Sequence, residues 1–223
     1  MTLAQTRDEF FRWDWVVDNA GAIWDRVVEH VYLTSIALAV GLIVSLALSV
    51  VALRYRRTYA PITWATGLLY TIPSLALFAF FVPITGFTTL TAEIGLVSYT
   101  LLILIRNIVA GIDGVDPFIK EAALGMGYTR RRLFLEIEVP LALPVIVAGL
   151  RIAAVTTIGL VTVTALVGQG GLGFFILRGL NRFFDTEIIV GTVLSVALAV
   201  AVDLTLLLIE RSLTPWARRR ATV

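Results

Sequence analysis

Long stretches without charged residues are the first feature of this sequence. Residues 31–53 contain no Asp, Glu, Lys or Arg, and residues 58–92 form a second charge-free run. As a helix, the first run is about 34 Å long, which is enough to cross a bilayer. The second run is too long for a single helix, and Pro83-Ile-Thr-Gly86 breaks it. We therefore predict a second span over 59–82, followed by an outer turn.

Three further apolar segments are long enough to span a membrane, although each carries one charged residue well inside it. We place these spans at residues 91–112 with Arg106, at 140–166 with Arg151 and at 187–209 with Asp203. The hydropathy pattern therefore predicts an all-α integral membrane protein with about five transmembrane helices.

The composition agrees with a membrane protein and excludes several other classes. Hydrophobic residues make up 58% of the chain and charged residues 15%, which is too apolar for an ordinary soluble domain. The formal net charge of +2 gives no reason to expect a nucleic-acid partner. Because cysteine is absent and His30 is the only histidine, we expect neither disulfides nor a metal site.

The positions of the basic residues predict the orientation of the spans. With five spans, eleven of the 18 basic residues fall on one side of the membrane and five on the other. The richer side holds Arg54, Arg56, Arg57, Lys120, Arg130, Arg131, Arg132, Arg211, Arg218, Arg219 and Arg220. Since basic residues favour the cytoplasmic side, we predict an outer N-terminus and a cytoplasmic C-terminus.

This orientation divides the chain into three parts. They are an amphipathic outer-surface segment at 1–29, a membrane domain at 30–210 and a basic cytoplasmic tail at 211–223. The outer segment carries three tryptophans, a residue type that prefers membrane interfaces. It has no apolar run close behind basic residues, so we do not expect a cleavable signal peptide.

The membrane domain contains one polar, amphipathic loop, residues 113–139, on the predicted cytoplasmic side. Asp116-Pro117 is a typical helix start, because aspartate can cap a helix and proline suits its first position. Gly127 is placed to end that helix, and Thr129 can cap a second short one. We therefore predict a compact pair of short helices between two membrane spans.

The first of these short helices is lined by small residues. They lie at positions 122, 123, 125 and 127. Another backbone could approach closely there, as when a helix docks in a groove of a partner protein. An amphipathic loop lying on the inner leaflet is the alternative. Pro140, directly after the loop, would open the fourth span.

The stretch EAALGMGYTRRRLFLEIEVP, residues 121–140, resembles the EAA loop of permease subunits in binding-protein-dependent ABC importers. The family pattern falls on Glu121, Ala122, Ala123, Gly127, Ile137 and Pro140. One position departs from it, since Val139 stands where the family usually has leucine. The resemblance implies the type I importer permease fold, with this loop as the coupling helix that docks into a cleft on a cytoplasmic ATPase.

Three other stretches resemble the osmoprotectant branch of these importers. They are YTIPSLALFAFFVP at 70–83, RNIVAGIDGVDP at 106–117 and ALVGQGGLGFFI at 165–176. Members of that branch import glycine betaine, carnitine, choline, proline betaine and related compounds. Permeases for methionine or another amino acid have similar loops and are the alternative. A secondary transporter is more distant, because no convincing internal repeat is found.

The resemblance also implies partners for the chain. It implies a permease that is not an enzyme and holds no cofactor, because ATP and Mg are bound by a separate ATPase subunit. A second permease, identical or related, would complete the pathway, and an extracytoplasmic substrate-binding protein would deliver substrate. The expected location is the cytoplasmic membrane of a bacterium or archaeon.

Polar residues within the spans are candidates for the transport pathway. The charge of Arg151, near mid-membrane, needs a cavity or a partner, and Asp203 is placed to reach it. Both a structural ion pair and direct substrate contact are consistent with this placement. Pro73 is expected to kink the second span beside Ser74, and Tyr70 could offer its ring to a trimethylammonium group. Plain packing is the alternative for the kink at Pro73 and Ser74. For Tyr70, the resemblance implies an alternative, since the aromatic cage of such importers usually belongs to the separate binding protein.

Two further features have ordinary interpretations. Arg106 lies near the inner end of the third span, where its side chain is expected to snorkel to the headgroups. The glycine-rich stretch 168–173 lacks the Lys-Ser/Thr of a phosphate-binding loop. We predict a tight turn there, leading into a short outer segment.

Overall fold

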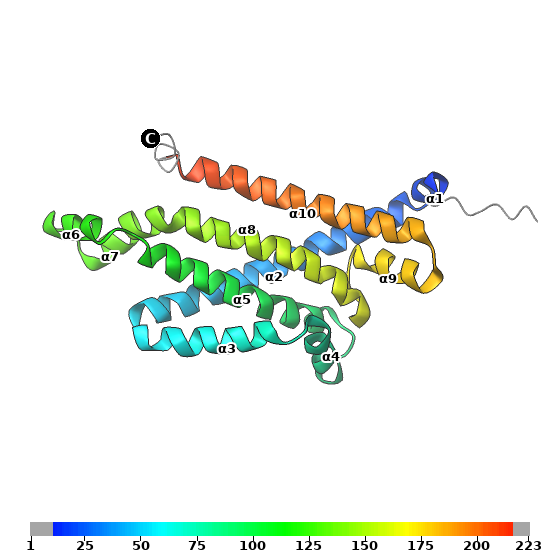
Figure 1. The fold of residues 1–223 in the computed structure, drawn as a ribbon, viewed down its shortest axis with the longest axis horizontal. Coiled ribbons are helices and arrows are strands. Elements are labelled where there is room, and N and C mark those ends of the chain that lie inside the picture. Colours follow the sequence, from blue (N-terminus) through cyan, green and yellow to red (C-terminus); the bar gives the residue numbers. More distant parts are fainter. Residues whose placement is uncertain (1–10, 216–223) are drawn as a thin grey trace, which may run out of the picture. The chain divides into compact units, whose positions relative to one another are not determined.

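The computed structural model describes residues 11–215, and all regular structure in that range is helical (Figure 1). The helices are α1 (Trp13–Asp18), α2 (Ala20–Arg54), α3 (Tyr59–Thr71), α4 (Ser74–Thr85), α5 (Thr89–Asp113), α6 (Pro117–Gly125), α7 (Arg130–Leu133), α8 (Val139–Val163), α9 (Gly173–Arg182) and α10 (Asp185–Leu213). Short turns η1 (Arg56–Thr58), η2 (Phe134–Glu138) and η3 (Thr164–Val167) lie between them. Parts of the predicted outer segment (1–10) and basic tail (216–223) lie outside the described residues.

Four helices of the described range are long and apolar enough to cross a membrane. They are α2, α5, the continuous helix Arg130–Val167 and α10. The broken pair 56–71 and 74–85 makes a fifth span if its two helices count as one. The prediction of an all-α membrane protein with about five spans is therefore confirmed. Helix α2 runs without interruption through residue 30, the predicted start of the membrane domain.

The chain forms two compact units, and several long helices contribute to both. Within the described residues, the first unit comprises 11–36, 73–96 and 158–199, and the second comprises 37–72, 97–157 and 200–215. The helices α2, α5 and α10 each pass from one unit to the other, and so does α8. The chain is therefore divided along its spans rather than between them.

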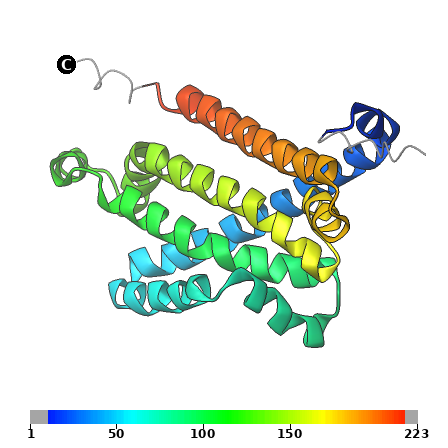
Figure 2. The ribbon, with the colours of Figure 1, turned by 45° about the vertical axis from the view of Figure 1, so that its right-hand side comes forward.

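Helix α5 forms the centre of the second unit. One buried cluster joins Ile105 and Val109 to Ala52 of α2, with residues of α3 packed against it. A second cluster joins Leu104 and Ile108 to residues of α8. In that unit α5 consequently lies between α3 and α8, as Figures 1 and 2 show.

Glycine brings α5 and α8 into close contact in the second unit. A Cβ atom added at Gly149 would lie 2.3 Å from the Cβ atom of Asn107, which is too near for any real pair of carbons. Asn107 cannot rotate out of the way, because its Cβ position is set by the backbone and its amide donates to the Ile103 carbonyl. The approach of these two helices therefore requires glycine at residue 149.

In the first unit, His30 links α2 to the glycine-rich stretch. Its ring is fully buried, with Nε2 3.0 Å from the Ile158 carbonyl oxygen and Nδ1 accepting the Leu172 N–H at 3.4 Å. Gly171 has a φ of 47°, and a Cβ atom there would lie 2.6 Å from the Cβ atom of His30. The predicted tight turn is confirmed, and both ring nitrogens of the histidine are held by the backbone.

The second span departs from its predicted shape. Helix α3 ends at Thr71 and α4 begins at Ser74, with a bend of 93° at the break, which is much sharper than a proline kink within one helix. Helix α4 also continues through Pro83, so the predicted end at residue 82 is wrong by three residues. The helix ends at Thr85, and Gly86 directly after it has a φ of 74°, which suits glycine. The proline at 83 removes one hydrogen bond without stopping the last turn.

The prediction that Pro140 opens the fourth span is also wrong. Helix α7 continues through the π-helical turn η2 into α8, so Pro140 lies inside the continuous helix Arg130–Val167. Proline lacks an N–H and clashes with the carbonyl four residues earlier, here that of Glu136. The wider π turn lies at this point and accommodates the proline without breaking the helix.

Two glycines of α8 provide a matched test of the close contact between α5 and α8. We expect Gly149→Ala to lower the thermal unfolding temperature of the detergent-purified protein, because α5 and α8 would have to separate. Gly159→Ala is the control, since a Cβ atom there meets nothing within 4 Å. It should be neutral or stabilising, because alanine is favoured over glycine in a helix by roughly 0.5–1 kcal/mol. Equal behaviour of the two variants would contradict the close contact at Gly149.

Candidate functional site

The loop predicted to couple to a partner is a hairpin of two short helices, α6 and α7. An Asp116 side-chain oxygen accepts the Phe118 N–H at 2.8 Å and starts α6. After α6, Gly127 has a φ of 86°, and the Tyr128 N–H donates to the Ala123 carbonyl at 3.1 Å. The Thr129 hydroxyl then accepts the N–H of Arg132 and starts α7. The predicted pair of helices, with its caps, is confirmed.

One face of α6 is apolar and exposed. Phe118 is 79% exposed and Met126 is 71% exposed, whereas Ala123 is completely buried. Glu121 and Ala122 are also exposed. Large hydrophobic side chains on a polar loop usually mark a contact surface, because leaving them in water costs free energy. The helix therefore buries one side against its own chain and presents the other.

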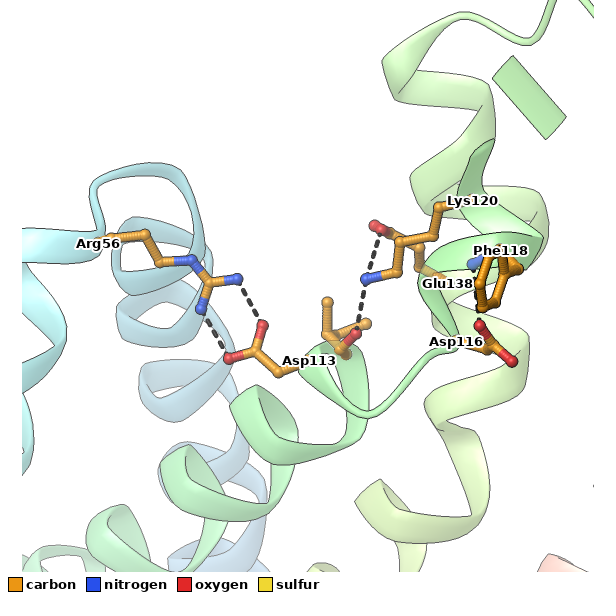
Figure 3. A network of polar contacts seen from close by, with 7 residues as sticks. Arg56, Asp113, Asp116, Phe118, Lys120 and Glu138 are labelled. Atoms are coloured by element: carbon orange, nitrogen blue, oxygen red, sulfur yellow. Dashed lines mark hydrogen bonds and ion pairs between the residues drawn. The ribbon is translucent and has the colours of Figure 1, made fainter. Parts of the chain in front are cut away.

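Lys120 fastens α6 to its base. Its ammonium group lies 3.1 Å from a carboxylate oxygen of Glu138, in the π turn, and 3.1 Å from the Ile112 carbonyl at the end of α5 (Figure 3). The side chains are only 24% and 15% exposed, so water screens this pair less than a surface pair. A single side chain thus joins the hairpin to both membrane helices that flank it.

A second ion pair holds the end of α5. Arg56 of η1 forms two parallel hydrogen bonds with the Asp113 carboxylate, one of them 2.7 Å long (Figure 3). This bidentate arrangement fixes orientation as well as distance. The turn after α2 and the last residue of α5 are therefore held together beside the hairpin.

The residues of the EAA pattern divide into two groups in the structure. Glu121, Ala122 and Gly127 are exposed on the hairpin, where a partner could contact them. Ala123 is buried within it, and Ile137 and Pro140 are half-buried in the continuous helix at its base. The first group thus forms surface, and the second shapes the support beneath it.

The charged residues inside the spans form a three-residue cluster. Arg151 donates to both Asp203 oxygens, from Nε at 2.8 Å and from Nη2 at 3.0 Å, so the ion pair is present. Its Nη1 also donates to Glu210 at 3.3 Å, a partner that the sequence analysis missed. Glu210 lies seven residues after Asp203 and therefore on the same face of α10, which is the signal that could have found it.

The residues around the break in the second span make a different set of contacts. Tyr70 stacks edge-to-face on Tyr99 with ring centroids 5.6 Å apart, and the Tyr99 hydroxyl donates to the Ile72 carbonyl. Pro73 and Ser74 lie at the start of α4, where proline needs no partner for a missing N–H. The structure thus brings Tyr70 together with Tyr99, and Arg151 together with Asp203 and Glu210.

The helical domain has several candidate spans, and between two of them lies an exposed hairpin that Lys120 attaches to both. This is the architecture of an importer permease. The chain matches the family described as "Binding-protein-dependent transport system inner membrane component" over residues 37–219. It therefore belongs to this family and is a multi-pass membrane protein.

Curated relatives cover nearly the whole chain. It is 36% identical over 197 residues to the glycine betaine/carnitine/choline transport system permease protein OpuCB of Bacillus subtilis, covering 88% of this chain and 91% of the relative. It is 36% identical to the choline transport system permease protein OpuBB of the same organism, with 91% and 93% covered. It is 33% identical to the osmoprotectant import permease protein OsmW of Salmonella typhimurium, with 90% and 96% covered.

A solved structure supports the fold. The MetNI methionine ABC transporter in an inward-facing conformation contains a chain similar to this one, with a TM-score of 0.72. The match covers 92% of this chain and all of the other, at 20% sequence identity. This likeness confirms the type I importer permease fold.

The Arg151 cluster leads to a prediction about stability. Asp203→Asn should lower the unfolding temperature of the purified protein, because it leaves the guanidinium without its bidentate partner in a low-dielectric setting. Glu210→Gln is the matched control, since it removes the longer, single contact and should have the smaller effect. Thermal unfolding in detergent, followed by tryptophan fluorescence, measures both. A larger loss for Glu210→Gln would show that the pair with Asp203 is not the dominant contact.

Proposed function

We propose that this chain is the permease subunit of an ATP-driven importer for a small quaternary ammonium osmoprotectant, such as glycine betaine, carnitine, choline or proline betaine. The relatives above, at 33–36% identity over about nine-tenths of the chain, support this substrate class. The observation that carries the permease role is the hairpin, which exposes Phe118, Glu121 and Met126 while Lys120 fastens it to the spans.

In the proposed mechanism, α6 docks into a cleft of a separate ATPase subunit that binds ATP and Mg. Closure of two such ATPases moves the docked hairpin. The movement passes through Lys120 to the end of α5 and through the π turn to α8. The chain itself performs no chemistry and holds no cofactor. Its spans change their arrangement and open the pathway to the side from which substrate arrives.

The proposal includes further partners and an orientation. Each chain offers one hairpin and two ATPases need one each, so a second permease, identical or related, completes the pathway. A substrate-binding protein delivers the osmolyte on the outer side. The hairpin faces the cytoplasm and the N-terminus faces outward, in agreement with the distribution of basic residues. The location is the cytoplasmic membrane of a bacterium or archaeon.

The alternative, a methionine permease, is less well supported. The likeness to the methionine transporter rests on 20% identity and concerns the fold. The relatives named above share 33–36% identity with this chain and are all named for osmoprotectants or choline.

Uptake by the complete importer tests this function. The genes for the ATPase, the binding protein and the permeases would be expressed in a host that lacks osmoprotectant uptake. Accumulation of labelled glycine betaine, carnitine, choline and methionine would then be measured at high osmolarity. We expect ATP-dependent accumulation of at least one quaternary ammonium compound. Methionine uptake alone, or uptake without the ATPase, would overturn the proposal.

Reversing a charge on the docking face should uncouple the transporter. Glu121→Lys is expected to lower uptake by about tenfold or more, since disrupting a central docking residue costs roughly 1–2 kcal/mol or more. Co-purification of the ATPase should fall in parallel, while insertion into the membrane stays normal. Glu121→Gln, which keeps the size and introduces no opposite charge, is the matched control. Full uptake by Glu121→Lys would show that this surface does not dock.

Gly127 allows a second test, because replacing this glycine strains the backbone conformation rather than filling occupied space. A Cβ atom there meets nothing within 4 Å, but the φ of 86° disfavours β-branched residues. Gly127→Val should distort the end of α6, at a cost of about 1–2 kcal/mol, and reduce uptake. Gly127→Asn should keep most activity, because asparagine tolerates a positive φ. Equal uptake by the two variants would mean that the shape of this turn does not matter for coupling.

A further inference from the structure

A cavity of about 510 Å³ lies between α3 and α5 in the second unit. Its volume is within the usual range of small-molecule sites, about 300–1,000 Å³. Its lining residues are Thr63, Trp64, Gly67, Leu68, Tyr70, Thr71, Leu102 and Arg106. One cation, two aromatic rings and several polar groups thus face a space that the hairpin and the Arg151 cluster do not use.

Arg106 supplies positive charge to this cavity. Its guanidinium is exposed, and within residues 11–215 it forms no hydrogen bond or ion pair, unlike Arg151. It lies seven residues, or about 10 Å, before the end of α5 at Asp113. An unpaired charge within a span is costly in lipid unless it reaches the headgroups or faces a cavity or a ligand, and Arg106 lines this cavity. A carboxylate is the group that a guanidinium binds best.

The other end of the cavity suits a cation. Tyr70 is 38% exposed, and its ring packs edge-to-face against Tyr99, which is buried and donates a hydrogen bond to the Ile72 carbonyl. Aromatic ring faces attract quaternary ammonium groups. Thr71, which also lines the cavity, is the last residue of α3, and the end carbonyls of a helix favour positive charge. Two independent features therefore favour an ammonium group there.

The two ends lie at different levels along the helices. Tyr70 contacts Tyr99, and a Cβ atom added at Gly67 would lie 4.0 Å from Leu102 Cδ1, so α3 and α5 run in opposite directions along this contact. The series continues to Trp64 and Arg106. Tyr99 and Arg106 are seven residues apart on α5, which is about 10 Å along the axis. The arginine side chain and a small zwitterion together can bridge that distance.

We infer that this cavity is a binding site for the transported osmolyte, in which Arg106 holds a carboxylate and Tyr70 holds a quaternary ammonium group. The inference rests on the proposed function and assigns the site at which a zwitterion such as glycine betaine is recognised within the permease. Tyr99 is a positioning residue, because it contacts Tyr70 rather than the cavity.

Comparing substrates with and without a carboxylate tests whether Arg106 binds the substrate or only stabilises the fold. The complete importer, with its binding protein, would be reconstituted in proteoliposomes, and uptake of labelled glycine betaine and labelled choline would be compared. Arg106→Gln should lower glycine betaine uptake about tenfold or more, as expected from loss of a charge-assisted hydrogen bond. Choline, which has no carboxylate, should change less than about twofold, because its contacts do not involve the guanidinium. Arg106→Lys, which keeps the positive charge, should retain much of the glycine betaine uptake that Arg106→Gln loses.

Tyr70 provides the complementary arm. Tyr70→Leu should lower uptake of both compounds, since both carry the trimethylammonium group, whereas Tyr70→Phe keeps the ring face and should retain uptake. If Arg106 has only a structural role, Arg106→Gln will lower uptake of both substrates together, and that result would overturn the inference. Unchanged glycine betaine uptake by Arg106→Gln would also overturn it, as would a wild-type importer that carries choline only.

Filling the cavity decides the matter if Arg106→Gln does not assemble. Gly67→Ala should be tolerated, because the added carbon would make an ordinary contact with Leu102. Gly67→Leu should block uptake of both substrates while ATPase activity stimulated by the binding protein persists, and full uptake would overturn the site. If the wild-type importer accumulates no quaternary ammonium compound, the proposed function fails. If the wild type is active and the variants behave otherwise than stated, only the site assignment fails.

Discussion

A lipid environment leaves no water for stray polar groups, and this constraint organises the described part of the chain. Most backbone groups are satisfied within helices, and at two irregular positions a side chain bonds the backbone. Tyr99 donates to the carbonyl that the break at Ile72 leaves free, and His30 bonds the backbone on both sides of its ring. Arg151 is neutralised by Asp203 and Glu210. The exposed guanidinium of Arg106 is therefore informative, because the same rule requires it to face something polar.

The sequence predicted what depends on local chemistry. Charge-free runs identified the spans, and the caps at Asp116 and Thr129 identified both helices of the hairpin. The distant pair of Arg151 with Asp203 was also predictable, because a charge inside a span needs a partner. Other features set by distant contacts were not predictable in this way. The pair of Lys120 with Glu138 joins residues on either side of a turn whose path must be known first. The continuity through Pro140 depends on a π turn, for which a sequence has no simple signal.

Under the proposed function, different residues of the hairpin serve docking to the ATPase and transmission of its movement. Exposed residues such as Phe118 and Glu121 make the surface, and in the proposed mechanism a change there would alter what binds. Lys120 and the Arg56–Asp113 pair make the attachment, and in the proposed mechanism a change there would alter how movement reaches the spans. The EAA pattern includes residues of both kinds, which explains why it extends well beyond α6 to Pro140. The pattern thus covers both the exposed surface of the hairpin and the helix that supports it.

The unbroken helix from Arg130 to Val167 has a mechanical consequence. At 38 residues it is about 57 Å long, which exceeds the thickness of a bilayer core, about 30 Å. Backbone hydrogen bonds therefore connect the base of the hairpin to this span without interruption. Under the proposed function, movement of the hairpin would enter the span through the backbone itself, at the π turn, without a relay of separate side-chain contacts.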